Sequence, residues 1–133
     1  MHSGLFDEET QYTLYYAYID NVKTSTKSII RSLGRKLELD HITFSNIFCN
    51  GDKDDSSIIY YDSGDTLHEF IIKSATLKDS KTNGALVKIS GDNNIIKFRG
   101  FKVDNTSSYG QVIENISRKV CSVLFIIFIF IFI

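Results

Sequence analysis

Five aspartates lie close together in the chain and are the first candidates for chemistry, because Ca²⁺ needs several hard oxygen ligands on a flexible loop. They are Asp52, Asp54, Asp55, Asp62 and Asp65, in the segment GDKDDSSIIYYDSGD. An EF-hand loop that begins at Asp52 would need a glycine where Ser57 stands and a bidentate glutamate where Ser63 stands. Both requirements fail, and the two clusters could meet only as neighbouring loops at one end of a sheet. We therefore interpret the segment as two solvated turns and predict no metal site.

The three histidines are the next candidates, because acid–base and nucleophilic catalysis need an imidazole beside a nucleophile and an orienting group. His2 is terminal, and His41 and His68 fall on predicted outward positions of strands. Neither stands beside a cysteine or serine in a recognised catalytic spacing, and the glycines form no phosphate-binding loop. The sequence therefore predicts no catalytic residue and no cofactor, which is typical of a protein that is not an enzyme.

The segment KFRGFKV could belong to an RNA-binding sheet surface around Lys97–Lys102, because Arg99-Gly100-Phe101 matches the start of an aromatic RNA-recognition motif. The next two positions do not match this motif, which requires a small and then an aromatic residue where the chain has Lys102 and Val103. The whole chain carries 15 basic and 16 acidic residues, so no excess of positive charge favours nucleic acid. A half-buried strand with a solvated cationic face is the preferred interpretation, and we predict that nucleic acid is not a partner.

An uncharged apolar segment, VCSVLFIIFIFIFI, occupies residues 120–133. As a helix it would span about 21 Å, which is short of the hydrocarbon core of about 30 Å. A C-terminal membrane anchor is one interpretation, and a translated intron is the other, because Lys119-Val120-Cys121 can be encoded by a sequence that contains a common intron start. A core element is disfavoured, because the segment has no polar face. The residues assigned to membrane contact are Val123, Leu124, Phe125, Ile126, Ile127, Phe128, Ile129, Phe130, Ile131, Phe132 and Ile133.

The elements that would position these residues begin with a predicted amphipathic helix over residues 8–35. Its stripe follows a spacing of three and four: Tyr12, Tyr15, Ile19, Val22, Thr26, Ile29 and Leu33. The alternative is a strand at YTLYYAYI followed by a shorter helix over 24–34, because tyrosine and threonine favour strands.

Strand patterns follow the first helix. Ile42, Phe44 and Phe48 are expected on one face of a strand, and 58–61 forms another. Residues 67–103 predict a three-stranded antiparallel meander with a hairpin at Asn83-Gly84. In its last strand, a bulge at Gly100 would bring Ile96, Phe98, Phe101 and Val103 to one side, and Ala85, Val87 and Ile89 share a face of the middle strand.

A capping box at Ser108 and Gln111 predicts a final helix that runs into the apolar tail. No internal repeat is visible. The expected fold is therefore α+β: one domain over 1–119 with an antiparallel sheet of about five strands, and a separate tail over 120–133.

Localisation is expected to be cytoplasmic or nuclear. The N-terminus MHSGLFDEE lacks the features of a secretory signal, and Cys49 and Cys121 have no motif spacing. If the tail is a true anchor, the protein would instead lie on the cytosolic face of a membrane.

The leading functional hypothesis is a non-catalytic interaction subunit that binds another protein. Its partner surface is expected on the tyrosine-rich first helix, at Tyr12, Tyr15, Tyr16 and Tyr18, with Tyr16 and Tyr18 facing outward. A tail-anchored membrane protein is the first alternative, and the RNA-binding surface is the second.

Overall fold

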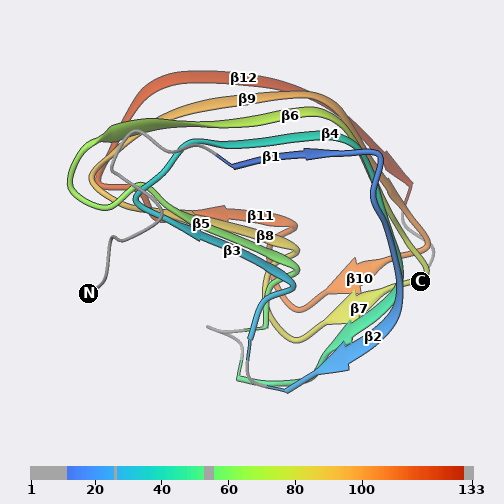
Figure 1. Ribbon diagram of the computed structural model, residues 1–133. Helices are drawn as coiled ribbons and strands as arrows, with labels where there is room; N and C mark the ends of the chain where they lie inside the picture. The colour runs from blue at the N-terminus through green and yellow to red at the C-terminus, as the bar shows by residue number, and fades with distance from the viewer. Residues whose placement is uncertain (1–11, 26, 53–55, 131–133) are drawn as a thin grey trace, which may run out of the picture.

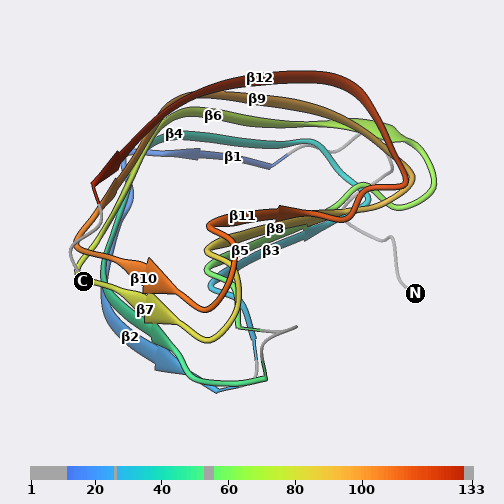
Figure 2. The same ribbon diagram turned by 180° about the vertical axis from the view of Figure 1, so that it is seen from behind.

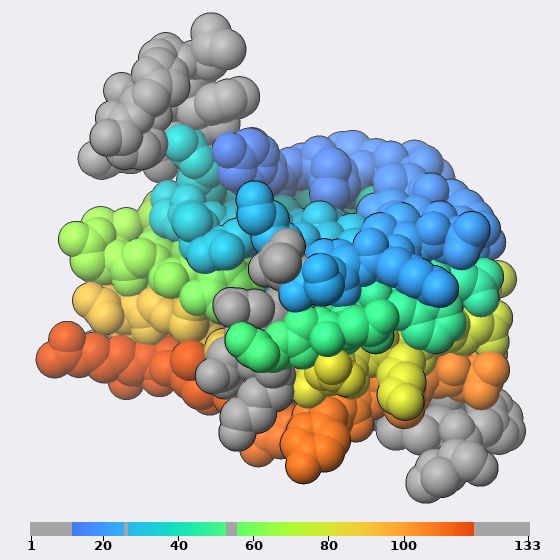
Figure 3. Space-filling view, turned by 90° about the horizontal axis from the view of Figure 1, so that it is seen from below, coloured from blue at the N-terminus to red at the C-terminus, as the bar shows by residue number. Residues whose placement is uncertain are grey.

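The computed structural model describes residues 12–25, 27–52 and 56–130, and in these residues the only regular elements are strands. The chain winds in successive coils, and each coil lies directly against the one before it (Figure 1). Seen from the side, the coils are stacked in chain order (Figure 3). The architecture is a β-solenoid.

The strands fall into repeating sets, one set to each coil. The first coil contains β1 (Tyr12–Tyr15), β2 (Tyr18–Thr24) and β3 (Ile30–Leu33), and the second contains β4 (Leu37–Cys49) and β5 (Ile59–Asp62). The third contains β6 (Leu67–Lys78), β7 (Lys81–Thr82) and β8 (Val87–Ser90). The fourth contains β9 (Asn93–Asp104), β10 (Ser107–Ser108) and β11 (Ile113–Asn115), and β12 (Lys119–Phe130) opens a further coil.

Every strand pair is parallel. In the described residues, one sheet has eight strands in the order β10-β7-β4-β6-β9-β12, with β1 and β2 also paired to β4, and the other has four in the order β11-β8-β5-β3. The view from behind shows β2, β7 and β10 on the same side of successive coils (Figure 2). Leu37 faces Phe70, and Phe70 faces Ile96, so equivalent positions recur after 33 and then 26 residues.

The core lies inside the coils, where inward side chains of successive coils stack on one another. Four buried aromatic rings form a continuous series. The ring of Tyr61 stacks on Phe70 at 4.8 Å between centroids, Phe70 meets Phe98 edge-on at 4.9 Å, and Phe98 meets Phe101 at 5.9 Å. Such contacts add stability beyond the apolar area that they remove from water.

Left-handed Asn and Asp residues form one corner of the coils. These are Asn21, Asn46, Asp79 and Asn105, with φ between 44° and 58°. Asn and Asp tolerate this conformation better than other residues with a side chain. Asn105 Nδ2 donates to Asp79 Oδ1 at 2.7 Å, and Asn46 Nδ2 donates to Asp20 Oδ1 at 3.0 Å, so the side chains also bridge neighbouring coils.

The predicted α+β class with an antiparallel sheet is wrong, and the first helix is the clearest part of the error. The described residues of this segment form β1, β2 and β3 instead, which corresponds to the strand alternative for YTLYYAYI but not to the helix over 24–34. The coiled-coil-like spacing of the apolar residues arises because the chain bends at Tyr16 and Asn21, both with positive φ, and each bend changes the side to which later side chains point.

The predicted antiparallel meander is also wrong, although its strands exist. β6 pairs in parallel with β9, while β8 belongs to the other sheet between β5 and β11. Asn83 and Gly84 connect β7 in one sheet to β8 in the other. The backbone N–H of Asn83 donates to the carbonyl of Cys49 in the preceding coil.

The predicted inward faces of two strands are confirmed. Ile96, Phe98, Phe101 and Val103 are all fully buried, as are Val87 and Ile89, and Ala85 is nearly so. The irregularity predicted at Gly100 is present as a register shift, because β9 has one more residue than β12 between Phe98 and Phe101. A Cβ atom at Gly100 would lie only 2.6 Å from the carbonyl oxygen of Lys73. Phe48 does not share the face of Ile42 and Phe44, because Asn46 reverses the alternation and Ile47 is buried instead.

The predicted C-terminal helix is absent. Ser108 lies in β10, and its hydroxyl donates to the carbonyl of Gln111 within a turn rather than capping a helix. Residues 119–130 form β12, which pairs in parallel with β9 from Lys119 to Phe130. The described residues contain no helix of the length and apolarity that a membrane span requires.

Candidate partner-binding surface

Three neighbouring tyrosines leave most of their surface in solvent on the outer side of the first coil. Tyr15, Tyr16 and Tyr18 are 55%, 75% and 62% exposed, and together we call them the tyrosine face. They come from the end of β1, the corner after it and the start of β2. The predicted outward orientation of Tyr16 and Tyr18 is confirmed, although a strand corner presents them and not a helix.

The ring of Tyr16 is held against the next coil. It stacks on His41 with ring centroids 4.7 Å apart and an angle of 20° between the planes. Both residues have positive φ and occupy the same corner in successive coils. His41 Nδ1 lies 2.8 Å from Asp40 Oδ1, so a carboxylate fixes the imidazole on which Tyr16 rests.

Tyr15 is held through its hydroxyl group. The hydroxyl donates to Glu38 Oε2 at 3.5 Å, and Lys73 Nζ lies 3.5 Å from the same carboxylate oxygen. Exposed pairs of this kind contribute little to stability. Their consequence here is geometric, because they connect β1, β4 and β6 on the outer surface and limit the orientations of the ring.

Tyr12 does not join the tyrosine face. Its ring packs against the core from inside the coil, and the guanidinium of Arg35 lies 5.6 Å from the ring centroid. Tyr12 and Tyr15 are three residues apart in a strand, so their side chains point to opposite faces. The predicted site is therefore divided, with Tyr15, Tyr16 and Tyr18 together outside and Tyr12 inside.

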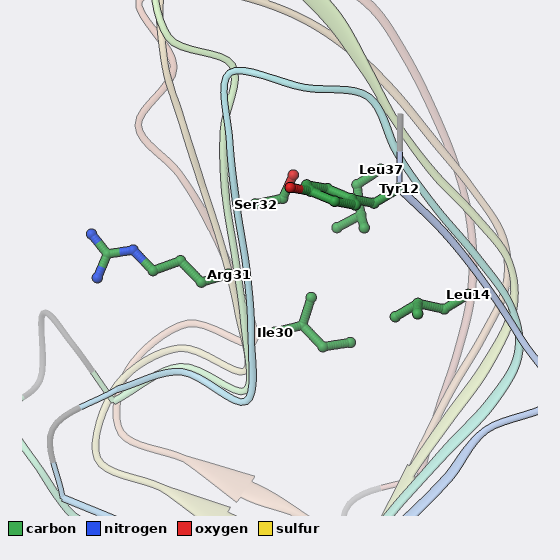
Figure 4. A pocket seen from close by; sticks show the side chains of 6 residues that line it. All are labelled: Tyr12, Leu14, Ile30, Arg31, Ser32 and Leu37. Carbon is green, nitrogen blue, oxygen red and sulfur yellow. The ribbon is translucent and has the colours of Figure 1, made fainter. Parts of the chain in front are cut away.

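A cavity opens at the mouth of the first coil (Figure 4). Its volume is about 190 Å³, and it is lined by Tyr12, Leu14, Ile30, Arg31, Ser32 and Leu37. Ser32 is buried, and its hydroxyl has no hydrogen-bond partner among the described residues. No pattern in the sequence indicates this cavity, because it depends on β1 and β3 lying across the coil from each other.

A smaller polar cavity of about 150 Å³ lies at the turns that lead into β4 and β6. It is lined by Gly34, Ser63, Gly64, Asp65, Thr66 and His68. His68 Nε2 lies 2.8 Å from the Thr66 hydroxyl, and among the described residues no carboxylate bonds the other ring nitrogen. The buried hydroxyl of Ser63 packs close to Gly91 and has no hydrogen-bond partner in the part of the chain that the structure describes. The sequence pattern predicted a solvated turn here and indicated no cavity beside His68.

The other candidate sites gain no geometry that supports them. Asp54 and Asp55 lie outside the described residues, and within the described part no three acidic, histidine or cysteine side chains gather as metal ligands would. At the RNA-like segment, Phe98 and Phe101 are fully buried, so neither ring is available to stack on a base, and Lys97 pairs with Glu69 at 3.5 Å.

The thiol of Cys49 is buried in the core and lies 4.0 Å from the carbonyl oxygen of Ser57. Burial raises the pKa of this thiol to about 11. A thiol that keeps its proton at neutral pH is a poor nucleophile. Cys49 therefore behaves as a small apolar core residue.

In comparisons with known proteins, the chain matches no family model, no curated protein and no solved structure.

Proposed function

We propose that this chain is a non-catalytic binding protein, and that another protein docks on the tyrosine face of its first coil. The observation that carries the proposal is the grouping of Tyr15, Tyr16 and Tyr18, each more than half exposed. Exposed aromatic residues are common singly, whereas neighbouring tyrosines are a feature of protein interfaces.

Two of the three rings are already held in place in the free protein. Tyr16 stacks on His41, and the hydroxyl of Tyr15 bonds Glu38. Side chains that are ordered before binding lose less conformational entropy when the partner arrives. A tyrosine also offers a large amphipathic surface with few rotatable bonds, which suits it to be an interface anchor.

The proposal is tested with the double variant Tyr16→Ser/Tyr18→Ser. Wild-type and variant chains are immobilised, and proteins captured from an extract of the source cells are quantified by mass spectrometry. We expect recovery of the specific partner to fall at least about tenfold, because truncating two central aromatic anchors removes a large part of the binding energy. Tyr109→Ser is the matched control, since Tyr109 is 75% exposed but follows β10 in the fourth coil.

Unchanged capture by the double variant would contradict the proposal. An equal loss with Tyr109→Ser would contradict it as well, because the effect would then not depend on the first coil. Circular dichroism of each variant checks that the strand content is preserved.

A further inference from the structure

The first coil presents an open strand edge beside the tyrosine face. β1 pairs with β4, and no strand among the described residues pairs with its other side. The amides of Tyr12 and Tyr16 donate to the carbonyls of Lys36 and Asp40. Alternate residues of a strand direct their backbone groups to opposite sides, so the N–H and C=O of Thr13 and Tyr15 face the open edge.

The inner side of this edge is apolar. A strand added against β1 would direct every second side chain towards the mouth of the coil, where the cavity of about 190 Å³ lies (Figure 4). Leu14, Ile30 and Leu37 line it, and Leu14 is partly exposed there. An apolar side chain placed in this cavity would leave water and contribute favourably to binding.

The outer side of the edge is aromatic and acidic. β1, β2 and β4 together carry three carboxylates, those of Asp20, Glu38 and Asp40, against one lysine. That lysine, Lys23, lies 6.0 Å from the ring of Phe48 at the far end of β2. Tyrosine rings and carboxylates together suit a cation, by cation–π attraction and by charge.

Carboxylate and lysine side chains already pair between successive coils of the solenoid. Glu38 of β4 meets Lys73 of β6, and Glu69 of β6 meets Lys97 of β9, each at 3.5 Å. A carboxylate on the outer surface is thus matched by a lysine from the next strand of the stack. The side chains of β1 carry no charge, so the acidic character beside its open edge comes from Glu38 and Asp40 of β4.

We infer that the edge of β1 binds an extended basic segment of the partner protein, in which apolar residues alternate with Arg or Lys. The segment adds a strand to the sheet through the backbone groups of Thr13 and Tyr15. Its apolar side chains enter the mouth of the coil, and its basic side chains lie over Tyr15 and near Glu38. This inference rests on the proposed function, because it names the chemistry of the partner that docks on the tyrosine face. A second copy of the chain fits less well, since its own β1 carries no basic side chain to place over Tyr15.

The test is a fluorescence anisotropy titration of the full chain against a labelled peptide with the sequence Ile-Arg repeated four times. Two comparison peptides carry Glu for Arg or Ser for Ile. We expect the Ile-Arg peptide to bind at least about tenfold more tightly than either comparison peptide. The Glu peptide lacks the basic side chains for the outer surface, and the Ser peptide lacks the apolar side chains for the cavity. Equal binding of all three peptides would overturn the inference.

Variants of the chain locate the binding. Thr13→Pro removes an N–H group that faces the open edge, which an edge strand tolerates, and should abolish binding. Glu38→Gln should weaken binding about threefold to tenfold and reduce its dependence on salt. Glu114→Gln, a carboxylate on β11 in the fourth coil, is the matched control and should change nothing.

The outcomes separate this inference from the proposed function. Peptide binding that survives Thr13→Pro overturns strand addition, yet leaves the tyrosine face as a binding surface if Tyr16→Ser/Tyr18→Ser still reduces partner capture. Concentration-dependent self-association that Thr13→Pro removes, measured by sedimentation, would show that a second copy occupies the edge and would overturn the inference.

Discussion

At the scale of single residues, two buried groups have altered acid–base properties because the coil interior excludes water. Burial raises the pKa of the Cys49 thiol from 9.0 to about 11. Burial raises the pKa of the Tyr61 phenol as well, and the charges of Glu69 and Asp62 act in the same direction. Both groups are neutral in the folded protein at a pH where the unfolded chain would already lose the proton.

The stability of the fold should therefore decrease in alkaline solution. Below pH 9.0 the contribution of Cys49 is fully present, and it is lost as the pH rises from 9.0 to about 11, because only the unfolded chain ionises in that range. Urea unfolding at about pH 8 and about pH 10.5 measures the decrease. In Cys49→Ala the decrease should be smaller but not absent, since Tyr61 still contributes. An equal decrease in both chains would contradict the assignment to Cys49.

At the scale of elements, the corners of the coil determine the fold more than the strands do. The strand patterns at 67–77 and 95–103 were correctly predicted, because alternation of apolar residues depends only on which side chains face inward. The pattern does not identify the neighbouring strand. The short polar segments after each strand resemble hairpin turns, but Gly64 and Gly91 redirect the chain at the corners that lead into β6 and β9.

The left-handed corner gives a prediction for Asn105. Asn105→Val should reduce the free energy of unfolding by about 1–2 kcal/mol, because a β-branched residue is strained at positive φ. Asn105→Gly is the control, since glycine adopts this conformation readily, and we expect a change below about 0.5 kcal/mol. Urea denaturation of the three chains decides the question. Equal destabilisation by both variants would mean that the hydrogen bond to Asp79, and not the backbone conformation, is what matters.

At the scale of the whole molecule, the repeat was hidden because its length varies. Equivalent residues recur after 33 and then 26 positions, and the longer interval includes the polar segment around Asp52 between β4 and β5. Without a constant period, the sequence shows no internal repeat. The helix predicted to run into the apolar segment at Val120 is wrong, because these residues pair in parallel with β9 and continue the stack as β12.

The candidate site was predicted in part. Tyr16 and Tyr18 were expected outside and lie outside, whereas Tyr12 was assigned to the same surface and lies inside. The helical spacing placed Tyr12 and Tyr15 on one face, but in a strand their odd separation places them on opposite faces. The cavity and the open edge of β1 follow from the parallel stack and could not be predicted without it.

Everything proposed for the first coil depends on the parallel stacking of the coils, and a disulfide cross-link tests that stacking directly. Thr76 and Lys102 face each other on β6 and β9, so their Cα atoms are about 4.8 Å apart. In a Cys121→Ser background, where Cys49 is buried, Thr76→Cys/Lys102→Cys should form a disulfide rapidly on mild oxidation. Thr76→Cys/Lys97→Cys, with the second cysteine five residues earlier on β9, should not.

In an antiparallel meander the strand at 85–90 would separate the first pair by about 10 Å, beyond the reach of a disulfide. Failure of the Thr76–Lys102 pair to cross-link would contradict the solenoid, and with it the open edge of β1.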